Sequence, residues 1–369
     1  MKIAVILGTR PEIIKMSPVI RELEKRNLDF FVLHTGQHYS YNLNKIFFEQ
    51  LKLPEAKYNV SVGSGSHAEE TGKMLIEIER VLQQEKPNIA LVEGDTNSVL
   101  AAALAASKLH IKVGHVEAGL RSYDRQMPEE INRTLTDHCS DYLFAPTQKA
   151  RDILLGEGIP EEKIFVTGNT IVDAIYQNLE LANEKRTGNK LNKLETLEPR
   201  TLNLEPKQYF LLTLHRQENV DNRERLGSIL KGLDKIAIEF CLPVIYPIHP
   251  RSRKMMSYFN LEPKNLELIE PLDFLSFLQL ESNAKLILTD SGGIQEESCI
   301  LGVPCVTLRN NTERPETLEV GSNILAGASP DKILECSRIM LGRENNWRNP
   351  FGDGNAGRRI ADILEGKHG

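Results

Sequence analysis

The chain has few cysteines, no long apolar run and no block of basic residues. Its five cysteines are scattered along 369 residues, with no CxxC pair and no Cys/His cluster at zinc-finger spacing. We therefore expect reduced thiols in a cytoplasmic protein, with neither disulfides nor a metal site. No apolar stretch approaches the ~18 residues that a membrane span needs, and the opening apolar run is too short for a signal peptide.

The charge balance also excludes some partners. The net charge is −6, which argues against nucleic acid or a membrane surface as the main partner. With 40% hydrophobic and 26% charged residues, the composition is that of an ordinary soluble globular protein. The length is too great for one modest core and favours two domains.

What the sequence does contain is a repeated alternation of apolar runs and amphipathic segments, which predicts parallel βαβ units. The expected strands of the first half are residues 2–8, 30–35, 88–94, 111–116, 142–146 and 163–168. Those of the second half are residues 209–215, 242–248, 266–269, 284–290 and 303–308. The expected helices of the first half are residues 11–26, 42–51, 68–85 and 97–109, and another begins near Pro128.

A polar segment separates the two halves. Residues 181–207 are polar and include Pro199 and Pro206, so we interpret them as a linker or surface excursion. The pattern predicts two doubly wound, Rossmann-like α/β domains, residues 1–180 and 208–350, facing each other across a cleft. Ligands of such sheets bind outside the carboxyl ends of the strands, so residues that follow strands are the candidate site.

Two loops have the character of phosphate-binding loops. Arg10 follows the first strand and precedes a helix, where a guanidinium can bind phosphate with two hydrogen bonds, although a surface arginine would also fit. Ser291, Gly292 and Gly293 begin a helix whose backbone N–H groups could hold a phosphate. Glu297, in the same helix, could accept two ribose hydroxyls. The alternative for this loop is a simple helix cap.

Carboxylates and a histidine follow other strands. Asp95 and Glu117 each come after an expected strand, Glu129 begins a helix, and His215 ends a strand of the second half. Alone, each has an ordinary explanation, as a helix cap, a solvated surface charge or a structural histidine. A second histidine cluster, at His249, ends another strand of the same half. These residues lie on separate loops without metal-ligand spacing, so we expect no metal.

Taken together, the motifs resemble those of the non-hydrolysing UDP-N-acetylglucosamine 2-epimerases. The resemblance runs in order from the first strand to about Gly327, and the last helix also fits. The motifs that carry it are GTRPEIIK, TGQHY, GDTNS, GHVEAGLRS, PEEINR, TGNTIVDA, LHRQEN, DSGGIQEE, TERPE and NAGRRIADIL.

This resemblance implies a GT-B fold with the active site between two Rossmann-like domains, and a final helix, residues 354–365, that returns to the first domain. It implies epimerisation at C2 of UDP-GlcNAc to UDP-ManNAc, by elimination of UDP to a 2-acetamidoglucal and re-addition. No metal, nicotinamide or other cofactor is implied. A homodimer is expected on the same ground.

The resemblance also implies roles for individual residues. Asp95, Glu117 and Glu129 match the acid/base carboxylates, and His215 matches a partner of the leaving UDP. Arg10 and Ser291 match phosphate contacts and Glu297 a ribose contact. Further matches to basic residues of the site are Lys15, Arg133 and Arg314. Glu130 is expected to be structural. Gln37 and His38 are the candidates for binding a second, activating UDP-GlcNAc, but the stretch QHYSYNLNKIF departs from the longer polar consensus that is linked to this activation in bacterial members.

Four rival functions remain. An epimerase of another UDP-2-acetamido sugar, such as a diacetamido uronic acid, would need an extra basic contact for the sugar carboxylate. A hydrolysing epimerase, which releases free ManNAc, usually has a different opening motif. A glycosyltransferase of the same fold has no need of the two glutamates Glu117 and Glu129. A non-catalytic nucleotide-sugar sensor has no need of the complete set Asp95, Glu117, Glu129 and His215.

Overall fold

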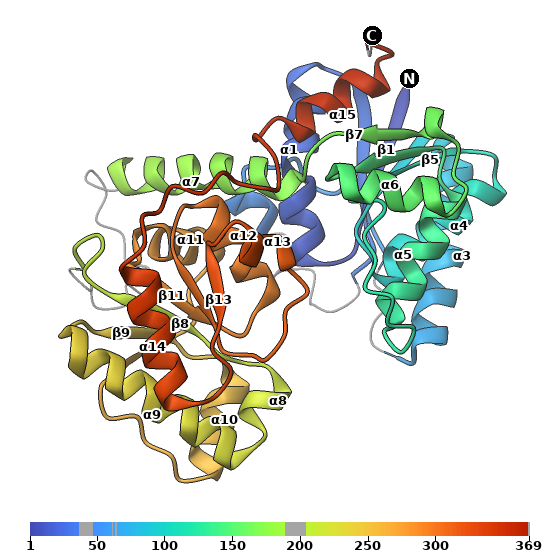
Figure 1. Ribbon diagram of the computed structural model, residues 1–369. Helices are drawn as coiled ribbons and strands as arrows, with labels where there is room; N and C mark the ends of the chain where they lie inside the picture. The colour runs from blue at the N-terminus through green and yellow to red at the C-terminus, as the bar shows by residue number, and fades with distance from the viewer. Residues whose placement is uncertain (37–46, 61, 63–64, 189–203, 368–369) are drawn as a thin grey trace. The chain divides into compact units, whose positions relative to one another are not determined.

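The computed structural model describes residues 1–36, 47–60, 62, 65–188 and 204–367. The chain forms two compact units, and Figure 1 shows the ribbon of each. Unit 1 consists of Met1–Gln177 together with Phe351–Gly369, and unit 2 of Asn178–Pro350. Gln37 and His38, the candidates for a second ligand site, lie outside the described residues.

Unit 1 contains a seven-stranded sheet in the order β3-β2-β1-β4-β5-β6-β7, with parallel pairing throughout. Its strands are β1 (Lys2–Leu7), β2 (Asp29–His34), β3 (Tyr58–Asn59), β4 (Ile89–Glu93), β5 (Lys112–Val116), β6 (Tyr142–Ala145) and β7 (Ile164–Val166). The strand order reverses at β1, which pairs with both β2 and β4. The carboxyl ends of β1 and β4 therefore flank the switch point where doubly wound sheets bind ligands.

Helices connect these strands. They are α1 (Arg10–Lys25), α3 (His67–Glu85), α4 (Asn97–Lys108), α5 (Pro128–Cys139) and α6 (Gln148–Gly156), with a 3-10 turn at Glu161–Lys163. Helix α7 (Thr170–Gly188) follows β7 and continues past Gln177 into unit 2, and α15 (Ala356–Leu364) is the last helix of the chain. Helix α4 is rich in alanine, and five of these alanines are almost completely buried. Their small side chains let the helix pack closely on the sheet and on α3.

The chain returns to unit 1 at its end, where α15 packs on α1 (Figure 1). The guanidinium of Arg26 on α1 forms ion pairs of 2.7 Å with both Asp362 and Glu365. Gly357 faces α1 so closely that a Cβ there would lie 3.0 Å from Pro18. Asp173 accepts hydrogen bonds from the first two backbone N–H groups of α15, which anchors the start of the helix.

Unit 2 contains a six-stranded parallel sheet in the order β10-β9-β8-β11-β12-β13. Its strands are β8 (Phe210–Thr213), β9 (Val244–Pro247), β10 (Leu266–Ile269), β11 (Leu286–Thr289), β12 (Cys305–Thr307) and β13 (Asn323–Leu325). Its helices are α8 (Gln217–Val220), α9 (Arg223–Phe240), α10 (Pro250–Tyr258), α11 (Phe274–Asn283), α12 (Gly292–Ile300), α13 (Pro315–Glu319) and α14 (Pro330–Leu341). The switch point of this sheet lies between β8 and β11.

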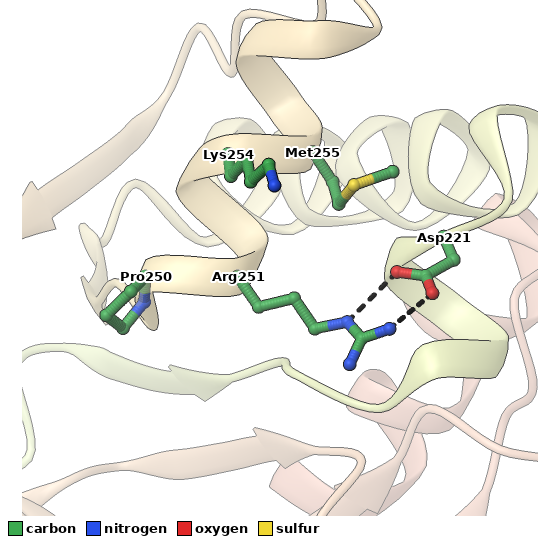
Figure 2. A pocket seen from close by; sticks show the side chains of 5 residues that line it. All are labelled: Asp221, Pro250, Arg251, Lys254 and Met255. Atoms are coloured by element: carbon green, nitrogen blue, oxygen red, sulfur yellow. Dashed lines mark hydrogen bonds and ion pairs between the residues drawn. The ribbon is translucent and has the colours of Figure 1, made fainter.

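Unit 2 also has a pocket beside α10, with a volume of about 520 Å³ (Figure 2). Asp221, Pro250, Arg251, Lys254 and Met255 line it. The guanidinium of Arg251 forms a two-pronged ion pair with the carboxylate of Asp221, and both side chains are exposed. Arg251 belongs with His249 to the histidine cluster that follows β9, and no other candidate site residue from the sequence lines this pocket.

The sequence predictions of two doubly wound α/β halves are confirmed. One boundary differs, because α7 continues to Gly188, eight residues into the segment 181–207 that we interpreted as a linker. That stretch contains leucine, glutamate, alanine, lysine and arginine, which favour a helix in spite of their polarity. None of the helices in the described ranges combines the length and apolar composition that a membrane span requires.

Candidate functional site

An ammonium group joins two glutamates at the carboxyl edge of the unit 1 sheet. The Nζ atom of Lys15, on α1, lies 2.5 Å from Oε2 of Glu117 and 3.2 Å from Oε1 of Glu93. Glu117 follows β5, and Glu93 is the last residue of β4. The side chains of Glu93 and Glu117 are only 2% and 9% exposed. Burial raises the pKa of Glu93 well above its usual value, and the charges of Glu117 and Glu12 act in the same direction.

Glu117 has an unusual backbone conformation. Its φ is +70°, in the left-handed region that residues other than glycine seldom adopt. The N–H groups of Glu117 and Ala118 both donate to the carbonyl of Phe144, which holds the turn in place. Such backbone strain is concentrated at functional sites, where surrounding contacts maintain it. The chain therefore bends sharply at the residue whose side chain contacts Lys15.

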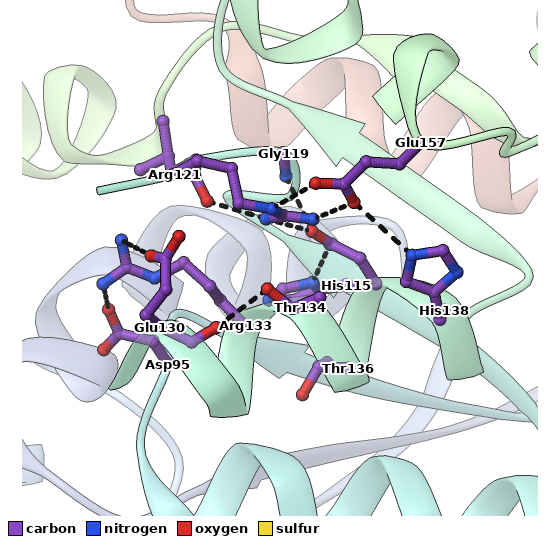
Figure 3. Close-up of polar contacts among 12 residues, drawn as sticks. Asp95, His115, Gly119, Arg121, Glu130, Arg133, Thr134, Thr136, His138 and Glu157 are labelled. Carbon is purple, nitrogen blue, oxygen red and sulfur yellow. Dashed lines mark hydrogen bonds and ion pairs between the residues drawn. The ribbon is translucent and has the colours of Figure 1, made fainter. Parts of the chain in front are cut away.

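The second carboxylate, Asp95, forms an ion pair with Arg133 from α5 (Figure 3). Asn132 donates to the carbonyl oxygen of Asp95 at 2.9 Å, so α5 also fixes the backbone of this loop. The Nη1 atom of Arg133 lies 3.3 Å from Glu130. The carboxylate of Glu130 accepts hydrogen bonds from the backbone N–H groups of Ser122 and Tyr123, so its contacts are structural.

Glu129 is the most accessible of the predicted carboxylates. It lies exposed in the first turn of α5, directly after Pro128. Within the part of the chain that the structure describes, its carboxylate forms no hydrogen bond or ion pair.

A buried charge network supports the loop after β5 (Figure 3). Asp137, on α5, contacts Nδ1 of His115 at 2.6 Å and Nη1 of Arg121 at 2.7 Å, and it accepts the N–H of Gly119. Nε2 of His115 lies 2.8 Å from the carbonyl oxygen of Gly94. Although burial opposes it, the charges of His115 and Arg121 lower the pKa of Asp137. The network ties together β5, α5 and the loops that carry Asp95 and Glu117.

Glu12, in the first turn of α1, is a further buried carboxyl group at this edge. It accepts hydrogen bonds from the N–H of Gly8 at 2.6 Å and from the hydroxyls of Thr9 and Thr96 at 3.0 and 2.7 Å. Burial outweighs these bonds and raises its pKa to about 7. Glu12 thus joins the loop after β1 to the loop after β4. Nearby, the guanidinium of Arg10 lies 5.9 Å from the ring centre of Phe47, within cation–π range.

In unit 2, one buried aspartate holds the loop that carries His215. Asp290 follows β11, and its carboxylate accepts the N–H groups of His215 and Arg216 and the side-chain amide of Asn219. Nε2 of His215 lies 4.0 Å from Oδ1 of Asp290. Burial lowers the pKa of His215; the carboxylate of Asp290 opposes this shift, whereas His249 and Arg216 add to it. His215 therefore favours its neutral form, in which one ring nitrogen donates and the other accepts.

The N-terminus of α12 lies beside this loop. Ser291 is its N-cap residue, with no capping hydrogen bond from its side chain, and Gly292 and Gly293 begin the helix. The Glu313 carboxylate lies 3.6 Å from the position of a Cβ built on Gly292. Arg309 holds that carboxylate with two hydrogen bonds of 2.8 and 2.9 Å. The bonds lower the pKa of Glu313 to about 2.

Glu297 and Arg314 complete the predicted set in unit 2. Glu297, on α12, is hydrogen-bonded to Glu281 of α11, whose side chain is completely buried. Burial, followed by the charge of Glu297, raises the pKa of Glu281 well above its usual value, so Glu281 can be the donor of this bond. Nε of Arg314 lies 2.9 Å from Glu296, and Nη1 donates to the carbonyl oxygen of Glu313.

Comparison with known proteins decides the family. The family model described as UDP-N-acetylglucosamine 2-epimerase matches residues 21–365. The chain is 58% identical to the UDP-N-acetylglucosamine 2-epimerase of Methanocaldococcus jannaschii, over 99% of both chains. The chain belongs to the UDP-N-acetylglucosamine 2-epimerase family. The prediction of an isomerase of this non-hydrolysing family is thereby confirmed.

A solved structure and a second relative bear on the fold of this family member and on the substrates found in the family. The crystal structure of the M. jannaschii enzyme in complex with UDP-GlcNAc and UDP matches with a TM-score of 0.82, at 57% identity over 99% of both chains. The chain therefore has the GT-B-like fold of these epimerases. It is also 42% identical, over 99% of both chains, to the UDP-2,3-diacetamido-2,3-dideoxy-D-glucuronate 2-epimerase of Pseudomonas aeruginosa.

The structure of this 2-epimerase family member brings some of the predicted residues together. Lys15 contacts Glu117, and Arg133 contacts Asp95. His249, in contrast, is an N-cap residue that accepts the N–H of Arg251, with its ring centre 5.6 Å from that of His215. Among the described residues, no group of three or more His, Cys, Asp or Glu side chains could hold a metal ion.

Sequence reasoning did not find Glu12, Glu93, His115, Asp137, Glu281 or Asp290. Glu93 ends an apolar strand, and a glutamate at that position is usually a mere strand terminus. The signal that could have found it is its place directly before the GDTNS motif. The partners of His115 and Asp290 lie far along the chain, so no local pattern marks them.

Proposed function

We propose that this protein interconverts UDP-N-acetylglucosamine and UDP-N-acetylmannosamine by inverting C2 of the sugar. The observation that carries the proposal is the pair of carboxylates Asp95 and Glu117, each bound to its own cation at the carboxyl edge of one sheet. Family membership and the M. jannaschii relative that binds UDP-GlcNAc and UDP support the choice of substrate.

In the proposed reaction, the bond between C1 and the UDP oxygen breaks first, and its electron pair leaves with UDP. The positive charge that develops at C1 acidifies the hydrogen on C2, which is otherwise a very weak acid. A carboxylate accepts that proton while the C1–C2 double bond forms, which gives 2-acetamidoglucal. Re-addition of UDP at C1, with a proton delivered to the opposite face of C2, completes the epimerisation.

The residues of unit 1 are suited to the proton transfers. Glu117 is held by Lys15, which favours its ionised form as a base. Asp95 is held by Arg133, and Glu129 lies exposed in the first turn of the same α5 helix. We assign the acid and base roles to Asp95, Glu117 and Glu129 as a set, since inversion requires a proton donor and a proton acceptor on opposite faces of C2.

The residues of unit 2 are suited to hold UDP. The first backbone N–H groups of α12, at Gly292 and Gly293, together with the hydroxyl of the N-cap residue Ser291, favour a phosphate, because a helix N-terminus carries partial positive charge. We assign Glu297 to the ribose hydroxyls and His215 to the departing diphosphate. Arg10 and Arg314 are the proposed cations that stabilise the growing phosphate charge.

A second candidate substrate is a UDP-2,3-diacetamido uronic acid. The 42% identity to the P. aeruginosa enzyme that acts on such a sugar favours it as an alternative. The chemistry at C2 would be the same, and only the groups that meet C3 and C6 of the sugar would differ.

A product assay tests the proposal. The protein is incubated separately with each UDP-sugar, and the products are identified by proton NMR. We expect a mixture of UDP-GlcNAc and UDP-ManNAc. Turnover of the diacetamido sugar alone would replace the substrate assignment, and release of free ManNAc would show a hydrolysing enzyme.

We also propose that the protein is a homodimer. Light scattering after size-exclusion chromatography tests this, because one chain has a mass of 41.6 kDa.

A further inference from the structure

Glu93 is the buried neighbour of the Lys15–Glu117 ion pair. Its carboxyl group is on the last residue of β4, and Lys15 is 3.2 Å away. Glu117 contacts the same ammonium at the shorter distance of 2.5 Å. Lys15 thus has two carboxyl groups in contact, of which Glu93 is the more deeply buried.

The charges around Glu93 do not balance if every group is ionised. Among the described residues, the charges that act on it most strongly are those of Lys15 and Glu12 from α1 and of Glu117 after β5. Lys15 supplies one positive charge, whereas Glu93 and Glu117 together would supply two negative charges. Repulsion between two carboxylates, in a place where water cannot screen it, favours a proton on one of them. Because desolvation disfavours the charged form, the more buried group is the one that holds the proton.

We propose that Glu93 is a positioning residue, whose protonated carboxyl group leaves the Lys15 ammonium to Glu117 and so keeps Glu117 ionised and in place. The neutral Glu93 can still contact the ammonium through its carbonyl oxygen. An ionised Glu93 would instead compete for Lys15, and Glu117 would lose part of the attraction that keeps it a carboxylate. The inference rests on the proposed function, in which Glu117 is one of the acid/base carboxylates.

The first test is spectroscopic and does not depend on turnover. Infrared spectra of the wild-type protein and of Glu93→Gln are recorded at pH 7 and subtracted. We expect the difference to contain the C=O stretch of a protonated carboxyl group. Glu85→Gln is the control with an ionised carboxylate, since hydrogen bonds to Lys2, Lys57 and Tyr58 lower the pKa of this half-buried group to about 2. Its difference spectrum should contain carboxylate bands and no band of a protonated carboxyl group. A carboxylate signal from Glu93 would overturn the proposal.

The second test uses the pH profile of epimerisation. Glu93→Gln keeps the shape and the neutral charge, so its kcat at pH 7 should stay within about twofold of the wild type. In the wild type, ionisation of Glu93 should make kcat fall at alkaline pH. The glutamine of the variant cannot ionise, so the fall in kcat should occur at higher pH. A loss of more than about 100-fold would assign the proton transfer to Glu93 itself, and an unchanged profile would deny its influence on Glu117. Either result would overturn the proposal.

The two tests separate the inference from the proposed function. If the wild-type protein epimerises no UDP-sugar, the proposed function fails, whereas the infrared band still reports the proton on Glu93. If the protein epimerises UDP-GlcNAc and the infrared band is absent, only the inference about Glu93 fails.

Discussion

Replacing Glu12 with glutamine should remove a large pH dependence from the stability of unit 1. The carboxyl group of Glu12 is buried and has a pKa of about 7, compared with 4.5 when unperturbed. A glutamine side chain has nearly the same shape. Its amide oxygen can accept the N–H of Gly8, and its NH₂ group can donate to the hydroxyls of Thr9 and Thr96. The variant should therefore keep the local structure and lose only the ionisable group at this position.

The magnitude follows from the difference between the two pKa values. Below pH 4.5 the carboxyl group is protonated in both the folded and the unfolded chain, so its favourable contribution is fully present. As pH rises, the unfolded chain releases this proton first, and the free energy of unfolding falls until the folded group also ionises near pH 7. At about 1.36 kcal/mol per pKa unit, the complete loss is about 3 kcal/mol, and between pH 5 and 8.5 it is about 2.5 kcal/mol.

The assay is native-state hydrogen exchange of the amides in β1 and β4, with the free energy of opening determined at several pH values. The quantity to compare is the difference in the free energy of opening between Glu12→Gln and the wild type. The contributions of the other titratable groups are the same in both proteins and cancel in this difference. His34, for example, has a pKa lowered to about 4 by burial and changes stability in the opposite direction. We expect the variant to gain about 2.5 kcal/mol relative to the wild type from pH 5 to 8.5. A difference that does not change with pH would refute the reasoning.

Three further substitutions test the site and its supports. Glu117→Gln should abolish epimerisation while calorimetry still detects UDP binding, and near-normal turnover would show that Glu117 is structural. Asp137→Asn should destabilise unit 1 by about 3–5 kcal/mol in urea unfolding, because it removes the carboxylate charge that the buried Arg121 guanidinium contacts. The exposed control Asp152→Asn should change the free energy of unfolding by less than about 0.5 kcal/mol. Glu281→Leu should weaken UDP binding about tenfold, since it removes a hydrogen bond to the charged Glu297, and Glu281→Gln should restore it. An equal loss in both Glu281 variants would contradict that account.

The fold was largely predictable because the central strands of both sheets are buried on both faces. Such strands are continuous apolar runs, and helices with amphipathic spacing separate them, so the alternation was visible in the sequence. Two short strands were less visible. β3 has two residues, and β13 has three, with a polar first residue. The helical extent of α7 was missed because a polar helix and a polar linker have similar compositions.

The site was predictable to the extent that it follows strand ends. Asp95 and Glu117 were singled out in this way as candidates, and the structure adds the cation that each one contacts. Buried partners such as Glu93 and Asp137 could not be found, because their effect depends on distances between residues that are far apart in the chain. The protonation of a carboxyl group depends on burial and on neighbouring charges, and neither is visible in a linear sequence.

The most direct test of the proposed function is incubation with UDP-GlcNAc in deuterated water, followed by proton NMR of the recovered UDP-sugars. If carboxylates remove the C2 proton and a proton returns from solvent on the other face, UDP-ManNAc should form with deuterium at C2. Recovered UDP-GlcNAc should also acquire deuterium as the reaction reverses. Formation of UDP-ManNAc that retains its original C2 hydrogen would contradict proton exchange at C2, and no product together with no exchange would contradict the proposed function itself.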